Sequence, residues 1–202
     1  MNHVFFRRRV FLLSIVACLA EIARAQASAP KVTVHLDPQK TEIHWTLHTT
    51  LHTVHGTFRL KGGIMTYNPA TGAAEGEFLV DVTTGESGNA TRDGNMQNEV
   101  FESKTYPQAF FHPVKVGGDL KSGSTQNVTV GGTFNIHGAD HPLTLQMAVQ
   151  LNGTDVTATT RFTIPYAAWG MKDESTFLLR VDKDVTVEVA GRGTIDGLSA
   201  GK

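Results

Sequence analysis

The sequence predicts an all-β fold, a single antiparallel barrel or sandwich of about eight strands with one short helical insertion. Apolar and polar residues alternate along most of the chain after residue 31, and a period of two is typical of strands with one apolar face. Turn-forming residues, chiefly glycine and asparagine, separate the alternating segments. A barrel of about eight strands is just wide enough to be filled by its side chains or to hold one small ligand.

The expected strands follow one another with short turns between them. Asn152-Gly153 is a strong hairpin signal, residues 137–142 are expected to form a hairpin loop, and residues 165–175 break the pattern. The barrel domain is expected to span residues 31–195, with a polar tail over residues 196–202. In chain order the alternating segments are residues 31–36, 43–52, 54–64, 77–82, 110–116, 128–136, 143–151, 156–164 and, closing the sheet, 177–181 with 185–189.

Residues 92–112 form the one long stretch without a clean alternation, and here we expect the helical insertion. Residues 90–101 fit a short helix or lid, with Met96 and Val100 among its apolar contacts. Pro107 then forces extended backbone, because a residue that precedes proline is pushed out of the α region. We interpret the segment as a plug or flap on the barrel.

The first 25 residues are predicted to be a signal peptide outside the fold. Arg7–Arg9 form a basic start, residues 10–20 are an apolar run too short to span a bilayer, and residues 23–25 (Ala-Arg-Ala) fit a cleavage site. We therefore expect cleavage after residue 25, a short linker over residues 26–30 and a periplasmic location for the mature protein.

Two features leave the export route open. Residues 8–12 resemble a twin-arginine export signal, and Cys18 lies in a segment that resembles a lipoprotein box. Cys18 is the single cysteine, so a mature chain without it has no disulfide and no catalytic cysteine. Removing the leader leaves 14 basic and 18 acidic residues, a formal charge of −4, which argues against nucleic acid as a partner.

The sequence shows no motif of a nucleophilic, phosphate-binding or zinc-protease site. His44, His48 and His52 are four apart, which on a strand separates neighbours by about 13 Å, too far to share one ion. His137 and His141 flank a loop that contains Asp140, a better geometry for a metal. A histidine-based metal-binding protein or metal-dependent enzyme is therefore one alternative function, and a stress-related barrel with a filled core is another.

A long apolar ligand needs no motif at all. Each five-carbon isoprene unit gains at most about 4 kcal/mol on full burial, at roughly 0.8 kcal/mol per carbon. A few such units exceed the entropic cost of association. A lipid carrier can therefore lack every catalytic signature, as this chain does.

Several segments, spread over residues 32–190, together resemble the YceI-like family of periplasmic polyisoprenoid-binding proteins. Their order and spacing across almost the whole domain carry the resemblance, rather than any single one of them. They are residues 51–58 (LHTVHGTF), 92–96 (RDGNM) with Phe101 and Tyr106-Pro107, 132–138 (GTFNIHG) followed by 142–145 (PLTL), and 164–166 (IPY) with Trp169-Gly170.

The resemblance implies a lipocalin-like antiparallel barrel whose elongated cavity takes an isoprenoid chain, such as a polyprenyl phosphate or a quinone tail. It also implies export to the periplasm. Two departures matter: many relatives carry histidine where Asn95 stands, and an arginine-aspartate pair where residues 166–169 stand. If those groups touch a head group in relatives, this protein prefers another head group or none.

The function predicted from the sequence is non-enzymatic binding, transport or storage of an isoprenoid lipid or quinone, without catalytic residues, metal or cofactor. A homodimer and a transient contact with the membrane are left open. The predicted ligand-binding residues are aromatic residues of the strands and three residues near the entrance. They are Trp45, Phe58, Phe78, Phe110, Phe134 and Phe162 on the strands, and Arg92, Asn95 and Met96 at the entrance.

Overall fold

The computed structural model describes residues 31–120 and 123–198. The predicted signal peptide (residues 1–25, with Cys18), the predicted linker (residues 26–30) and residues 199–202 of the expected tail lie outside the described residues. The predictions made for them stay predictions.

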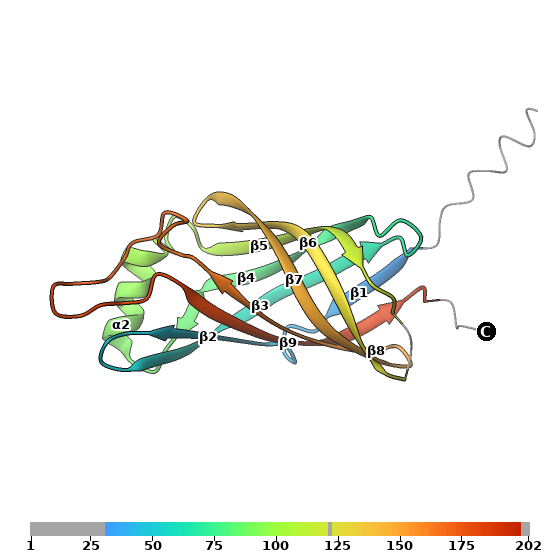
Figure 1. Cartoon of the computed structure of the whole chain (residues 1–202), viewed down its shortest axis with the longest axis horizontal. Helices are drawn as coiled ribbons and strands as arrows, with labels where there is room; N and C mark the ends of the chain where they lie inside the picture. Colours follow the sequence, from blue (N-terminus) through green and yellow to red (C-terminus); the bar gives the residue numbers. More distant parts are fainter. Residues whose placement is uncertain (1–30, 121–122, 199–202) are drawn as a thin grey trace, which may run out of the picture. The chain divides into compact units, whose positions relative to one another are not determined.

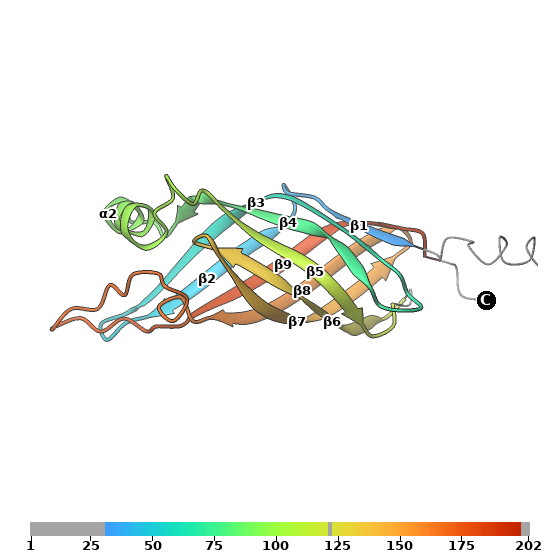
Figure 2. The ribbon, with the colours of Figure 1, turned by 90° about the horizontal axis from the view of Figure 1, so that it is seen from above.

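Strands make up most of the described chain, and all of their pairings are antiparallel (Figures 1 and 2). Their inward faces carry the alternating apolar residues, because successive side chains of a strand point to opposite faces of the sheet. The strands are β1 (Val32–Leu36), β2 (Glu42–His48), β3 (Thr53–Tyr67), β4 (Ala74–Glu86), β5 (Gln108–Gly117), β6 (Thr125–Ile136), β7 (Ala139–Asn152), β8 (Asp155–Ile164) and β9 (Val185–Asp196).

The strands close into a ring with eight positions. Each strand from β2 to β9 pairs with the next, and β9 pairs back with β2. β1 and β2 share one position, since β1 pairs with the C-terminal parts of β3 and β9 and β2 pairs with their N-terminal parts. The predicted antiparallel barrel is therefore confirmed, and the sandwich alternative is excluded because the ring is closed.

The hairpin between β6 and β7 is tighter than the sequence suggested. Ile136 pairs with Ala139, so the turn consists of His137 and Gly138 alone. Both have positive φ, 52° and 75°, as a turn that follows the twist of the strands requires. The prediction of a loop over residues 137–142 is wrong for residues 139–142, which belong to β7.

Residues 165–184 form a loop rather than ending in a further strand. Phe177 in this loop is fully exposed, and an isolated bridge between Thr49 and Val181 joins the loop to the end of β2. The prediction of a strand over residues 177–181 is wrong, because β9 already occupies the place between β8 and β2. β9 itself reaches Asp196, the first residue of the expected tail.

The predicted helical insertion is present at one end of the barrel, as Figures 1 and 2 show. It consists of α2 (Ala90–Asn95) and a π-helical turn, η1 (Met96–Val100). The Asn89 side chain caps α2 by accepting a 3.0 Å hydrogen bond from the Arg92 amide, which satisfies one of the free donors of the first turn. No helix within the described residues is long and apolar enough to cross a membrane.

Candidate functional site

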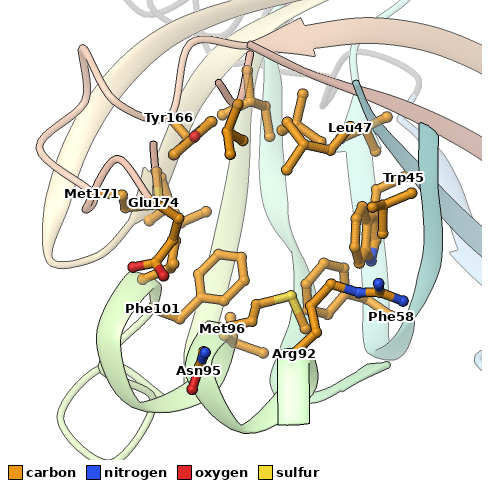
Figure 3. A pocket seen from close by; sticks show the side chains of 18 of the residues that line it. Trp45, Leu47, Phe58, Arg92, Asn95, Met96, Phe101, Tyr166, Met171 and Glu174 are labelled. Atoms are coloured by element: carbon orange, nitrogen blue, oxygen red, sulfur yellow. The ribbon is translucent and has the colours of Figure 1, made fainter. Parts of the chain in front are cut away.

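The interior of the barrel has two unlike ends. At the end that holds β1, buried side chains fill the space between the strands, and we call this the filled end. At the end that carries α2, a cavity of about 590 Å³ lies between the strands, and we call this the hollow end (Figures 1 and 3). The side chains of the filled end include Val32, Val34, Met65, Tyr67, Val116, Val130, Val149, Leu151, Val156 and Ile195.

Strand alternation supplies most of the cavity wall. β2 contributes Trp45 and two leucine or isoleucine residues at every second position, and β9 contributes three valines in the same way. β6, on the far side of the ring from β2, and β8, the neighbour of β9, each place one phenylalanine and one isoleucine inward. The wall residues of the strands are Ile43, Trp45, Leu47, Val54, Phe58, Val80, Val82, Ala109, Phe134, Ile136, Phe162, Ile164, Val185, Val187 and Val189.

Two segments outside the strands cover the hollow end, and we call them the roof: residues 96–101 of the insertion and residues 171–181 of the loop after β8. Figure 3 shows Met171 on the other side of the cavity from Trp45. The ring of Phe101 meets that of Phe58 edge to face, with 5.5 Å between ring centroids. Aromatic pairs in this geometry add specific attraction to area burial.

An ion-pair cluster joins the two roof segments. The Lys172 ammonium donates to the carboxylate of Glu99 on η1 and lies 3.0 Å from the carboxylate of Glu174. The hydrogen bond to Glu99, followed by that to Glu174, raises the pKa of Lys172 above its usual value. Surface pairs of this kind contribute little stability, so the roof is held mainly by its apolar contacts.

The cavity opens between α2 and the β2–β3 hairpin, a place we call the mouth. Asn89, Thr91 and Asn95 on the helix side and His52 on the hairpin side line the cavity and are also exposed. The mouth is therefore polar, while the wall behind it is aliphatic and aromatic. A binding site with an apolar body and a few polar groups at its rim is typical of small-molecule pockets.

Arg92 lines the cavity near the mouth, but much of its hydrogen-bonding capacity is used locally. Its Nε donates to the Ser87 hydroxyl at 2.7 Å and its terminal NH2 to the Ser87 carbonyl at 2.9 Å. The Asp93 carboxylate accepts from both the amide and the hydroxyl of Ser87. Arg92 therefore ties α2 to the end of β4.

The barrel wall is split where β7 and β8 part. Their ladder ends at the pair Met147 and Thr160, although β7 continues along β6 and β8 along β9. The Thr160 hydroxyl donates to the Gln146 carbonyl at 2.7 Å and ends the ladder. Trp169, from the loop after β8, stacks on His141 of β7 with 4.0 Å between centroids and 5° between planes. This loop therefore contributes to the wall.

Two buried donors in the cavity wall have no hydrogen-bond partner among the described residues: Trp45 Nε1 and the Tyr166 hydroxyl. Trp45 is 6% exposed and Tyr166 is 7% exposed. Burial, and then the nearby carboxylates of Asp173 and Glu174, raise the pKa of Tyr166 to about 12. The phenol is therefore a neutral donor at physiological pH, and unsatisfied buried donors call for a partner such as water or a ligand.

Seven of the nine predicted ligand-binding residues lie around this cavity: Trp45, Phe58, Arg92, Asn95, Met96, Phe134 and Phe162. The other two do not line it. Phe78 points inward but packs on Phe111 in the filled end, with 6.4 Å between centroids. Phe110 points outward, because Ala109 and Phe111 take the inward positions of β5, and it stacks on His112.

The sequence analysis missed two groups of lining residues. The aliphatic residues of β2 and β9 share the alternation of the predicted aromatic residues, so this signal was available for them. Tyr166, Met171, Glu174 and Leu179 come from the irregular loop. No periodic signal marks such residues, because their position depends on how the loop folds over the barrel.

The geometry gives no support to the two alternative functions, a histidine-based metal site and a stress-related barrel with a filled core. The described residues contain no group of three histidine, cysteine or acidic residues that could hold a metal ion. His137 lies 2.8 Å from the Glu102 carboxylate, whereas His141 stacks on Trp169. A filled core is also at odds with the cavity at the hollow end.

A family model described as a YceI-like domain matches residues 35–192, in agreement with the resemblance drawn from the sequence. No curated protein matches the chain significantly.

Solved structures share the fold. BcnA of Burkholderia cenocepacia has a TM-score of 0.64 and 21% identity, with 79% of this chain and 99% of that chain covered. A polyisoprenoid-binding domain from Saccharophagus degradans, described as implicated in plant cell wall breakdown, has a TM-score of 0.63 and 21% identity, with 80% and 98% covered. A YceI protein of Campylobacter jejuni has a TM-score of 0.52 and 15% identity, with 65% and 79% covered. At these identities the likeness shows the fold alone.

Proposed function

The chain belongs to the YceI-like family, and from this premise we propose that it binds an isoprenoid lipid inside the barrel without converting it chemically. The single observation that carries the proposal is the cavity of about 590 Å³ at the hollow end. Its wall is aliphatic and aromatic, and its opening is polar. This matches a ligand with a long apolar chain and a small polar end.

The size and chemistry of the cavity favour an apolar occupant over water. A volume of 590 Å³ corresponds to roughly twenty waters at about 30 Å³ each. Apolar walls give these waters few hydrogen-bond partners, and burying a chain of isoprene units there gains about 25 cal/mol for each Å² removed from water. A structural neighbour described as polyisoprenoid-binding supports the same class of ligand.

The polar groups of the cavity favour an uncharged head group, such as the carbonyl of a quinone, over a phosphate. Trp45 and Tyr166 line the cavity, and each carries a buried donor without a partner among the described residues; a small rotation of either ring would present its donor to a carbonyl oxygen in the cavity. Arginine and lysine side chains are the strongest protein partners of a phosphate. Arg92 is the one arginine or lysine among the described lining residues, it is already bonded to Ser87, and Glu174 also lines the cavity.

Native mass spectrometry of the protein from its own cells, followed by organic extraction, tests this proposal. The expected result is a bound mass that extracts as a prenyl quinone. A polyprenyl phosphate would overturn the choice of head group while keeping the carrier function. A protein that is empty and takes up no added isoprenoid would overturn the function itself.

Tyr166→Phe separates head-group recognition from burial of the chain. The variant keeps the ring and removes the hydroxyl, so its affinity for a prenyl quinone should fall about tenfold, the value of roughly one hydrogen bond. Its affinity for squalene, which has no oxygen, should not change. Equal affinities of both proteins for the quinone would contradict a role of Tyr166 in recognition.

We further propose that the protein works in the periplasm as a carrier or store, as the predicted leader suggests. N-terminal sequencing of the exported protein tests the leader directly. The expected mature chain begins at Gln26. An unprocessed chain recovered from the cytoplasm would contradict this location.

A further inference from the structure

Three large apolar side chains beside the mouth are left in solvent. Phe177 is 100% exposed, Leu178 85% and Leu51 75%, the highest values among the large apolar residues that the structure describes. Leu51 lies at the turn of the β2–β3 hairpin, and Phe177 and Leu178 lie in the loop after β8. We call these three residues the apolar tip.

Backbone hydrogen bonds hold the two turns of the apolar tip side by side. The Thr50 amide donates to the Arg180 carbonyl at 3.0 Å, and the Asp182 amide donates to the His48 carbonyl at 2.9 Å. Figures 1 and 2 both show the hairpin and the loop together at the end of the barrel that carries α2. The two turns of the apolar tip therefore form one hydrogen-bonded unit rather than two independent loops.

The turn that carries Phe177 and Leu178 presents both side chains outward. The Thr176 amide donates to the Leu179 carbonyl at 2.7 Å, and the Leu179 amide donates to the Thr176 hydroxyl at 3.0 Å. These bonds close a tight hairpin with Phe177 and Leu178 at its apex.

The apolar tip is continuous with the cavity. Leu179, directly after Leu178, lines the cavity, as do Thr49 and His52 on either side of the hairpin turn. An apolar path therefore runs from the exposed tip, past Leu179, to the wall residues behind it. On the other side of the mouth, Thr91 and Asn95 of α2 line the cavity.

We propose that the apolar tip inserts into the surface of a lipid bilayer and brings the mouth of the cavity against it, so that an apolar ligand passes between bilayer and barrel. This inference rests on the proposed function for its ligand, but the contact with the bilayer does not. Apolar side chains that project from a surface partition into the interfacial region of membranes in proportion to their buried area. Arg180, beside the tip, can keep its guanidinium in the head-group layer.

The shape and charge of the tip favour a bilayer over a protein partner. A stable protein interface buries about 800 Å² on each side and needs a complementary surface, whereas the tip is two protruding turns. The nearby carboxylates of Asp173 and Glu174 pair with Lys183 and Lys172, so the loop has no cationic excess. We therefore expect docking to zwitterionic lipid, driven by apolar burial rather than by charge.

Flotation with phosphatidylcholine vesicles tests the contact. The test uses protein purified from its own cells. Its intact mass must show no acyl group, so that a lipid attached at Cys18 is not the cause of flotation. The wild type should float with the vesicles, and Phe177→Ser with Leu178→Ser should lower the partition coefficient at least about a hundredfold. The control is Val114→Ser, which removes an apolar side chain that is 59% exposed on the barrel wall and should change nothing.

A tryptophan at the apex gives a direct readout of insertion. In Phe177→Trp, added vesicles should shift the emission to the blue, and brominated acyl chains should quench it. Val114→Trp carries the same two native tryptophans and should show neither effect. Quenching in both variants or in neither would overturn the proposal.

Transfer of a prenyl quinone between two vesicle populations connects the contact with the function. The double serine variant should transfer the quinone about tenfold more slowly than the wild type, while it binds a short-chain quinone in solution equally well. Equal transfer rates, or a wild type that does not float, would overturn the proposal; the latter result would favour a protein partner. A failure of the proposed function would appear separately, as wild-type protein that takes up no quinone while it still floats.

Discussion

The filled end and the hollow end of the barrel are built by the same strands, with the same alternation and similar residue types. At the filled end, Phe78 and Phe111 face each other across one strand pair and close the space between them. At the hollow end, Phe134 and Phe162 also point inward, but they border a cavity of about 590 Å³. Large inward side chains are therefore not sufficient to fill a barrel.

The two ends differ in how far the hydrogen-bonded ladders between neighbouring strands extend. At the filled end β1 completes the position between β3 and β9, and the β7–β8 ladder continues to its turn at Asn152 and Asp155. At the hollow end the β4–β5 ladder stops at Asp81 and Gln108, and the β7–β8 ladder stops at Met147 and Thr160. Where neighbouring strands separate, the ring widens, and α2 with η1 and the loop after β8 cover the space. The length of each ladder thus determines whether the interior is packed or open.

The largest expected effect comes from truncating one phenylalanine at each end. Phe111→Ala should lower the free energy of unfolding by about 3–5 kcal/mol, because it leaves a cavity in close packing. Phe162→Ala enlarges a space that already exists, so we expect a loss of about 1–2 kcal/mol. Urea denaturation of both variants measures the two values. Equal losses would contradict the division into two ends.

The next effect concerns the split between β7 and β8. Trp169→Ala removes the ring that stacks on His141 and should lower the free energy of unfolding by about 2–3 kcal/mol. Amides of residues 139–146 should exchange faster with solvent. The matched control is Phe110→Ala, an outward aromatic residue beside intact ladders, with an expected loss below about 1 kcal/mol. Unchanged amide exchange in Trp169→Ala would show that contacts other than the Trp169–His141 stack protect residues 139–146.

Replacing either of two glycines near the roof by alanine should change the stability of the protein, in opposite directions. A Cβ at Gly85 would collide with the Phe58 ring and lie 2.9 Å from Met96 Cε, so Gly85→Ala should cost about 1–2 kcal/mol. Gly94 in α2 has no atom within 4 Å of the same position, and Gly94→Ala should stabilise the protein by about 0.5–1 kcal/mol. Thermal unfolding of both variants measures the signs. The same sign for both would contradict the packing of the insertion.

The last effect appears only at alkaline pH and is the pH dependence that Tyr166 contributes. Its pKa is raised from 10.0 to about 12 in the folded protein, so between these values the unfolded chain loses its phenolic proton while the folded chain keeps it. Stability should therefore fall as the pH rises from 10 to 12. Tyr67, whose pKa burial also raises, contributes in the same direction. The free energy of unfolding of Tyr166→Phe, measured with urea, should fall less steeply over this pH range than that of the wild type. An equally steep fall would show that other groups cause the pH dependence.

Much of the hollow end was predictable from the sequence, because strand alternation is a local property. Trp45, Phe58, Phe134 and Phe162 could be placed near the cavity from alternation and family resemblance together. The same signal included Phe110, which faces outward. Alternation separates two faces, but it does not say which face is inside when apolar residues occupy both, as they do at Phe110 and Phe111.

The sequence by itself determined the antiparallel barrel, the short helix before β5 and the family, because alternation, turn residues and motif order are all written along the chain. The tertiary structure alone decided where each ladder stops, which end is hollow, and that Tyr166, Leu179 and the apolar tip lie at one mouth. The physical reason is that these features depend on contacts between segments far apart in the sequence. The closed ring leaves no place for a strand at residues 177–181, so Phe177 and Leu178 project into solvent while Leu179 and Val181 line the cavity.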